Sequence, residues 1–255
     1  MPPQSIDEVL TRLDQIIAEA RRTDDPLGYF AALYRDVTAR VASTIEDGDF
    51  RDGSRMERLD VVFANRYFEA LEARGTEAGP PRAWASAFAA ADRWRPLVLQ
   101  HLLLGMNAHI NLDLGVAALE AAPTSGLSDL RADFMRINQI LGDMIEAVQR
   151  RLARVSPWIG VLDRLGGGVD EAVSNFSLAR ARDDAWSFAT RLDSLDGDRH
   201  GAAIDAKDRE TARRADKILT PGGLWVVPVL VIVRLREDGD VSSVIEVLSR
   251  TSPAA

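Results

Sequence analysis

"HLLLGMNAHINLDL", residues 101–114, is the stretch that decides the fold of this 255-residue chain. It is apolar enough for a protein interior, yet two histidines, two asparagines and an aspartate interrupt it. Pro96 is well placed to begin a helix here, and "PTSG" at 123–126 to end it. Because an unpaired buried polar group costs roughly 1–3 kcal/mol, the polar residues must find partners. We therefore expect a central, largely buried helix at about 96–121.

The polar residues of this helix fall into two stripes when successive residues are placed about 100° apart. One stripe comprises His101, Gly105, His109 and Asp113, and the opposite stripe comprises Gln100, Asn107 and Asn111. At most one of them can face bulk water. Gly105, which costs about 1 kcal/mol relative to alanine in mid-helix, leaves room either for a ligand or for a closely packed neighbouring helix.

Helical signals dominate the rest of the chain. Ser5 with Glu8 and Ser54 with Glu57 have the spacing of capping boxes. The run "LWVVPVLVIV" at 224–233 has the β-branched residues of a strand, but no partner strand is evident, so we favour a buried helix. We predict a single all-α domain over residues 1–255, a bundle of about nine or ten helices whose C-terminal helices occupy 203–250.

Composition narrows the classes of function. A net charge of −8 argues against a nucleic-acid partner. The chain has no cysteine, which excludes disulfides and thiolate chemistry. The N-terminus lacks the features of a signal peptide, and the longest apolar run is about half of what spans a bilayer. We expect a cytoplasmic protein without a membrane partner, and its oligomeric state stays open.

Several charged residues share faces with apolar ones. Asp60 lies on the same helix face as Met56, Phe63 and Tyr67, and Asp133 lies at the rim of another apolar stripe. Arg182 shares the apolar side of its helix with Trp186. One interpretation is an ion-pair network of Asp60, Asp113, Asp133 and Arg182. The other is a shared pocket with shifted pKa values, in which His101, Gly105, Asp133, Arg182 and Trp186 contact a substrate.

His109 and Asp113 are spaced i, i+4, so their side chains can meet. Three interpretations remain open: a structural hydrogen bond, an acid–base pair in a pocket, or a divalent-metal site formed by His109, Asp113 and Asp60. In the acid–base case Asp60 is a second carboxylate, and Asn107 or Tyr67 donates a hydrogen bond. No cofactor is required by the sequence, and one divalent metal is the alternative.

The segments "LDVVFANRYFEAL", "AWASAF", "LLLGMNAHINLDL", "LRADFMRINQIL" and "ARDDAWSFA" resemble an uncharacterised, largely actinobacterial family of unknown function. The similarity covers about 28–195, and "GMNAHIN-DL" is its most specific element. The resemblance implies a helical domain and no activity. From the residues we expect an enzyme that acts on a small, fairly apolar molecule by histidine–aspartate acid–base chemistry. In a variant of this expectation, a divalent metal assists the reaction. The alternative is a non-catalytic helical module that binds a ligand or partner and has a structural polar core.

Overall fold

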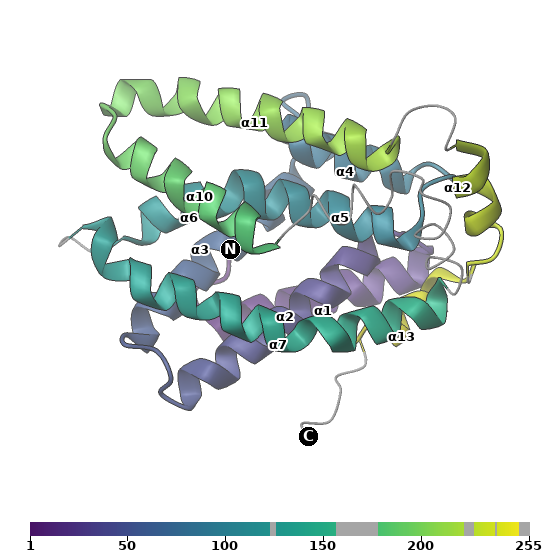
Figure 1. Ribbon diagram of the computed structural model, residues 1–255, viewed down its shortest axis with the longest axis horizontal. Coiled ribbons are helices and arrows are strands. Elements are labelled where there is room, and N and C mark those ends of the chain that lie inside the picture. Colours follow the sequence, from purple (N-terminus) through teal and green to yellow (C-terminus); the bar gives the residue numbers. More distant parts are fainter. Residues whose placement is uncertain (123–125, 157–177, 222–226, 238, 250–255) are drawn as a thin grey trace.

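The computed structural model describes residues 1–122, 126–156, 178–221, 227–237 and 239–249 (Figure 1). Within these ranges every regular element is a helix and no strand occurs. Counting the continuous central helix once, the described residues form ten α-helices. The predicted all-α bundle of nine or ten helices is therefore confirmed.

The described helices follow one another along the chain in this order. The first four are α1 (Ile6–Thr23), α2 (Leu27–Glu46), α3 (Gly53–Glu72) and α4 (Arg82–Ala91). The central helix consists of α5 (Val98–Ala108), the π-helical turn η1 (His109–Asp113) and α6 (Leu114–Ala121). The 3-10 turn η2 (Leu127–Leu130) leads into the long helix α7 (Arg131–Val155). The last four are α10 (Leu178–Asp193), α11 (Gly197–Leu219), α12 (Val227–Arg234) and α13 (Val241–Ser249).

Side-chain caps mark the starts of α1 and α3. Ser5 caps α1 by accepting a hydrogen bond from the Glu8 amide, but the Glu8 carboxylate accepts from Gln4, not Ser5. The predicted cap at Ser54 is wrong, because Asp52 caps α3 and accepts from the Arg55 amide. The described part of 224–233 is helical in α12, as predicted. Helix α11 begins at Gly197, six residues before the start at 203 predicted for the C-terminal helices.

The central helix passes through the middle of the bundle. Figure 1 shows α5 and α6 between α11 on one side and α2 and α7 on the other. Val98–Ala121 is long and apolar enough to cross a membrane by length and composition, but 89% of its most apolar window is buried inside the protein. It is therefore the core helix predicted at 96–121.

The polar stripe opposite His109 binds α11. The Gln100 side chain donates to the Ile218 carbonyl at 2.7 Å, and the Asn107 side chain donates to the Thr211 carbonyl at 3.0 Å. Arg214 of α11 donates to Asn111 at 3.2 Å. These hydrogen bonds explain how a buried helix accommodates three amides. They fix the rotation of the central helix and direct the histidine stripe toward α2 and α3.

Helix α7 is anchored at its two ends and spans the space between them. Near its start, the Asp133 carboxylate accepts hydrogen bonds from the backbone amides of Arg51 at 2.8 Å and Asp52 at 3.1 Å. Near its end, Arg151 pairs with the buried Asp36 at 2.7 Å. Residues 141–150 between these anchors are all exposed or half-buried. The middle of α7 therefore covers the bundle without packing fully into it.

Candidate functional site

An elongated, mainly apolar cavity lies beneath the middle of α7. Its volume is about 740 Å³, and its described lining comes from α2, α3, α5, η1, α6, α7 and α10. Along α7 the lining extends from Ile137 to Leu152, and along the central helix from Leu99 to Leu114. Each span of 15 residues corresponds to about 22 Å of helix rise. The cavity has the size of a small-molecule site and is long and narrow.

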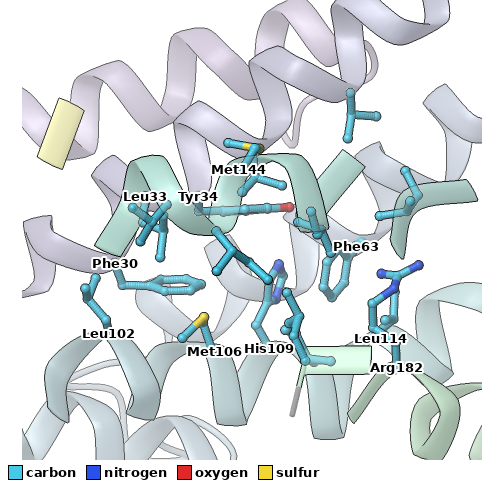
Figure 2. Close-up of a pocket in the computed structure, with 18 of the residues that line it drawn as sticks. Phe30, Leu33, Tyr34, Phe63, Leu102, Met106, His109, Leu114, Met144 and Arg182 are labelled. Carbon is cyan, nitrogen blue, oxygen red and sulfur yellow. The ribbon is translucent and has the colours of Figure 1, made fainter. Parts of the chain in front are cut away.

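Polar groups gather toward one end of this cavity. Figure 2 shows the His109 ring between Met106 and Phe63, with Arg182 and Leu114 on the Phe63 side and Leu102 on the Met106 side. The Tyr34 ring lies across the cavity near the His109 ring (Figure 2). The Leu102 end is mainly apolar and includes Phe30 and Leu33, whereas Arg182 lies at the opposite end (Figure 2).

His109 is the central polar residue of the cavity wall, and its side chain is 3% exposed. Its Nδ1 lies 3.3 Å from the Asp113 Oδ2 atom. Phe63 stacks on the imidazole ring at a centroid distance of 3.5 Å, and Tyr34 contacts it edge-on at 4.6 Å. Nε2 is buried and has no hydrogen-bond partner among the described residues. The ring is therefore fixed through one nitrogen and unsatisfied at the other.

Three side chains fix the Asp113 carboxylate. Trp84 donates its indole N–H to Oδ2 at 2.8 Å, and Arg66 forms an ion pair with Oδ1 at 3.5 Å. A carboxylate paired with a guanidinium accepts hydrogen bonds and does not donate them. The proton between the two residues consequently belongs to His109 Nδ1. In a neutral ring the lone pair is then on Nε2.

The environment of His109 keeps it neutral. Burial lowers its pKa below the ordinary 6.5, and the hydrogen bond that it donates to Asp113 opposes this only in part. The Arg66 charge lowers the pKa further. At neutral pH the imidazole is therefore an unprotonated base with a fixed tautomer.

Asp60 lines the same cavity as His109 and is 9% exposed. Its Oδ2 has no hydrogen-bond partner among the described residues. Burial, helped by the neighbouring Glu57 charge, raises the pKa of Asp60 to about 7. Asp60 therefore shares the cavity wall with His109, and it is a carboxyl group partly protonated at neutral pH. No hydrogen bond joins it to His109 or Asp113 in the described structure, so they share a cavity but form no bonded cluster.

Arg182 is a buried cation in the cavity wall and is 5% exposed. It donates to the Asn138 side chain at 2.5 Å and to the Phe134 carbonyl at 2.6 Å, and its guanidinium lies 4.4 Å from the centre of the Phe134 ring. It forms no ion pair with any carboxylate in the described ranges. Burial lowers its pKa to about 9, and Asp183 offsets part of this shift.

The predicted ion-pair network of Asp60, Asp113, Asp133 and Arg182 is wrong. Asp113 pairs with Arg66, and Asp133 binds the backbone amides that precede α3. Arg182 bonds to groups of α7, and Asp60 has no cation partner within the described chain. The physical reason is that nearer groups bind Asp113 and Asp133, while Arg182 reaches only neutral acceptors on α7 within the described chain.

Four predicted substrate contacts lie outside the large cavity. Asp133 anchors α7, and Trp186 packs against Phe134 at 5.0 Å. A side chain on Gly105 would come within 2.5 Å of the Phe30 ring, so the close-packing alternative holds there. His101, whose pKa burial lowers to about 4, contacts Tyr29 edge-on at 5.7 Å.

Two predicted hydrogen-bond donors also lie elsewhere. Asn107 binds α11, on the opposite side of the central helix from His109. Tyr67 packs in an aromatic cluster, 4.9 Å from Trp84 and 5.3 Å from Phe30, and burial raises its pKa well above 10. Neither residue lines the cavity, and Tyr34 of α2 is the tyrosine that does.

The predicted metal set does not converge. No group of three or more histidine or carboxylate side chains in the described ranges is arranged to hold a metal ion. His109 and Asp113 meet at one edge of the imidazole, while Arg66 already neutralises the carboxylate. Asp60 is not bonded to either of them.

Four residues of the site were not identified from the sequence: Tyr34, Phe63 and Trp84 around the imidazole, and Arg66 on the carboxylate. The helical spacing of Phe30, Leu33, Tyr34, Val37 and Val41 is the signal for the α2 wall of the cavity. No comparable pattern identifies Arg66 or Trp84, because their contact with Asp113 depends on the packing of three helices.

The π-helical turn gives this site its local geometry. It covers His109–Asp113, and the Leu114 amide bonds to the His109 carbonyl five residues back. Such turns are rare and frequently occur at functional sites. The regular α-helical spacing assumed from the sequence therefore stops at His109.

Fold and site together define an all-α protein in which a histidine paired with an aspartate lines a mainly apolar cavity. The chain belongs to a family of unknown function, DUF5995, whose model matches residues 6–221. This range includes α1 to α11 and hence every described cavity residue named above. Searches of curated proteins and of solved structures gave no significant match.

Proposed function

We propose that the protein is an enzyme that transfers a proton to or from a small, fairly apolar molecule bound beneath α7. One observation carries the proposal: His109 is held through Nδ1 by Asp113, while its Nε2 has no partner among the described residues and the ring lines a cavity of about 740 Å³. A histidine oriented by a carboxylate, with its second nitrogen free to accept a proton, is the arrangement used in general base catalysis.

His109, Asp113 and Asp60 would have different roles in this proton transfer. His109 Nε2 accepts a proton from the bound molecule, and Asp113 holds the ring and stabilises the imidazolium that forms. Asp60, with a pKa of about 7, is available as a proton donor in the same cavity. Opposite displacements of two pKa values in one cavity are typical of acid–base pairs. Tyr34 and Phe63 exclude water from the ring.

A second candidate is a non-catalytic module that binds an apolar ligand. The burial of Nε2 favours it, because neighbouring side chains cover this atom. In that case the polar groups of the central helix serve to fix its rotation and position. In the enzyme, Nε2 accepts a proton from the bound molecule, whereas in the module it does not. A proton-exchange experiment distinguishes the two functions.

The test is hydrogen–deuterium exchange into candidate ligands. The protein is incubated in D₂O with a panel of apolar carbonyl compounds and carboxylic acids, and mass spectrometry measures deuterium at carbon. We expect the enzyme to catalyse exchange into at least one compound that it binds. Failure to exchange any bound compound would favour the module.

His109→Asn is the decisive variant, because an asparagine amide keeps a donor toward Asp113 but removes Nε2. Exchange should fall at least about 100-fold, while ligand affinity and melting temperature change little. Asn107→Ala is the matched control on the opposite stripe, and its exchange rate per folded molecule should equal that of wild type. Unchanged exchange in His109→Asn would contradict the proposal.

We also propose that a small molecule, and not a nucleic acid or a membrane, is the partner, and that the protein is cytoplasmic. The net charge of −8 and the burial of Val98–Ala121 support this. We further propose that "GMNAHIN-DL" is the signature of a bacterial, largely actinobacterial family, because His109 and Asp113 lie in it. Salt-sensitive binding of duplex DNA at micromolar protein would contradict the first proposal.

A further inference from the structure

We propose that the cavity binds a single-chain aliphatic carboxylate, whose head group pairs with Arg182 and whose chain extends beneath α7 past His109 toward Leu102. The proposal specifies the class of ligand that the cavity binds. It rests on the proposed function only where it assumes proton transfer at His109. Three observations carry it: an unpaired buried cation, the shape of the cavity and the distribution of polar groups in it.

Arg182 supplies the argument for an anionic head group. Buried charges in proteins are normally paired, and among the described residues this guanidinium meets a carbonyl, an amide oxygen and a ring face but no carboxylate. Its described partners, Phe134 and Asn138, are uncharged, and the neighbouring Asp183 forms no ion pair with it in the described ranges. Arginine offers a planar set of donors that matches a carboxylate. A carboxylate arriving in the cavity would therefore complete the partners of Arg182.

The cavity shape supplies the argument for a single extended chain. It follows about 22 Å of helix rise along both α7 and the central helix, and the two helices run alongside each other in Figure 1. A volume of about 740 Å³ spread over this length leaves a narrow cross-section. A flat, compact ring system would leave both ends of such a cavity empty, whereas an alkyl chain would fill it.

The distribution of polar groups supplies the orientation. In Figure 2 the order along the cavity is Arg182, Phe63, His109, Met106 and Leu102. Beyond Met106 the described lining is almost wholly aliphatic and includes Leu33, Leu99 and Leu152. A carboxylate at Arg182 would therefore place the first part of the chain beside His109 and the remainder among the leucines.

The experiment compares three ligands of equal chain length: dodecanoate, dodecanol and methyl dodecanoate. Displacement of a fluorescent fatty acid measures their affinities at pH 6, where Asp60 is mostly neutral. We expect the acid to bind at least about tenfold more tightly than the alcohol or the ester, because only the acid pairs with Arg182. Affinity for longer acids should rise by up to about fourfold per methylene until the cavity is full.

Arg182→Gln tests whether Arg182 pairs with the carboxylate head group, and Arg191→Gln is its matched control. Arg191 is exposed on the same helix, α10, and lies over Phe188, which is outside the cavity. The preference for the acid should disappear in Arg182→Gln and persist in Arg191→Gln. If Arg182→Gln does not fold, the comparison of the three ligands on the wild-type protein still decides.

Three outcomes would overturn the inference: equal binding of acid, alcohol and ester, binding of none of them, or an acid preference that survives Arg182→Gln. Its failure is distinct from failure of the proposed function. Carboxylate binding that depends on Arg182, together with deuterium exchange unaffected by His109→Asn, would support the ligand class and contradict the enzyme. Conversely, deuterium exchange that is lost in His109→Asn, without carboxylate binding that depends on Arg182, would contradict only the ligand class.

Discussion

His109 Nδ1 lies 3.3 Å from Asp113 Oδ2, the oxygen that also accepts from the Trp84 indole, while Arg66 pairs with Oδ1. The carboxylate connects α3, α4 and the central helix, so one ion pair and two hydrogen bonds determine the tautomer of the imidazole. The catalytic proposal depends on this relationship, because it leaves Nε2 unprotonated.

Asp113→Asn tests the relationship directly. The amide keeps the shape but loses the charge, so the tautomer of His109 is no longer imposed. We expect proton exchange to fall by about 100- to 10,000-fold. Stability should also decrease, by about 3–5 kcal/mol, because the partly buried Arg66 loses its ion pair with Asp113. Urea unfolding and exchange rates measure the two effects, and a variant with wild-type exchange would contradict the role of Asp113.

Asp60→Asn should change how stability depends on pH. The Asp60 pKa is about 7 in the native protein and about 3.9 in an unfolded chain. Between these values the unfolded state releases a proton that the native state retains, so the contribution of Asp60 to stability falls as pH rises from about 4 to 7. The upper bound of this loss is on the order of 4 kcal/mol.

Urea unfolding at pH 4.5 and pH 8 measures this contribution. In Asp60→Asn the stability difference between the two pH values should shift in favour of pH 8 relative to wild type. Asp143→Asn, an exposed position on α7, is the surface control. Identical differences in wild type and Asp60→Asn would mean that Asp60 is not held protonated by burial.

Gly105→Ala tests the close packing of the central helix against α2. The added methyl group would lie 2.5 Å from the Phe30 ring, so the helices must separate. We expect a loss of about 1–3 kcal/mol in unfolding free energy. Gly142→Ala in α7 is the control, because nothing lies within 4 Å of its added carbon, and it should stabilise by about 0.5–1 kcal/mol. Equal effects of the two substitutions would refute the packing at Gly105.

Asn107→Ala tests whether the polar stripe that faces α11 affects stability without affecting ligand binding. It removes the bond to the Thr211 carbonyl and the acceptor of Asn111, both buried. The unfolding free energy should fall by about 1–3 kcal/mol. Ligand affinity should remain at the wild-type value, because Asn107 does not line the cavity. Calorimetric titration with dodecanoate checks this, and a large loss of affinity in a folded variant would place Asn107 at the site after all.

The features that depend on the residue pattern of a single helix could be predicted from the sequence. Helical periodicity and the polar residues of 101–114 predicted the all-α fold and the buried central helix, and the position of Asp60 among apolar residues predicted its burial. The partners of Asp113 and Arg182 were not predictable in this way, because Arg66, Trp84 and Phe134 reach them only through the packing of separate helices. The π-helical turn at His109 was missed because a uniform helical period cannot reveal it.

The most direct measurement is the ¹⁵N NMR spectrum of the His109 imidazole as a function of pH. The account predicts that Nδ1 carries the proton and Nε2 does not throughout neutral pH. It also predicts that the ring gains a second proton only below pH 6.5, since burial lowers its pKa. His109→Asn assigns the signals by their loss. A proton on Nε2 at neutral pH, or a His109 pKa above 6.5, would contradict the proposed base.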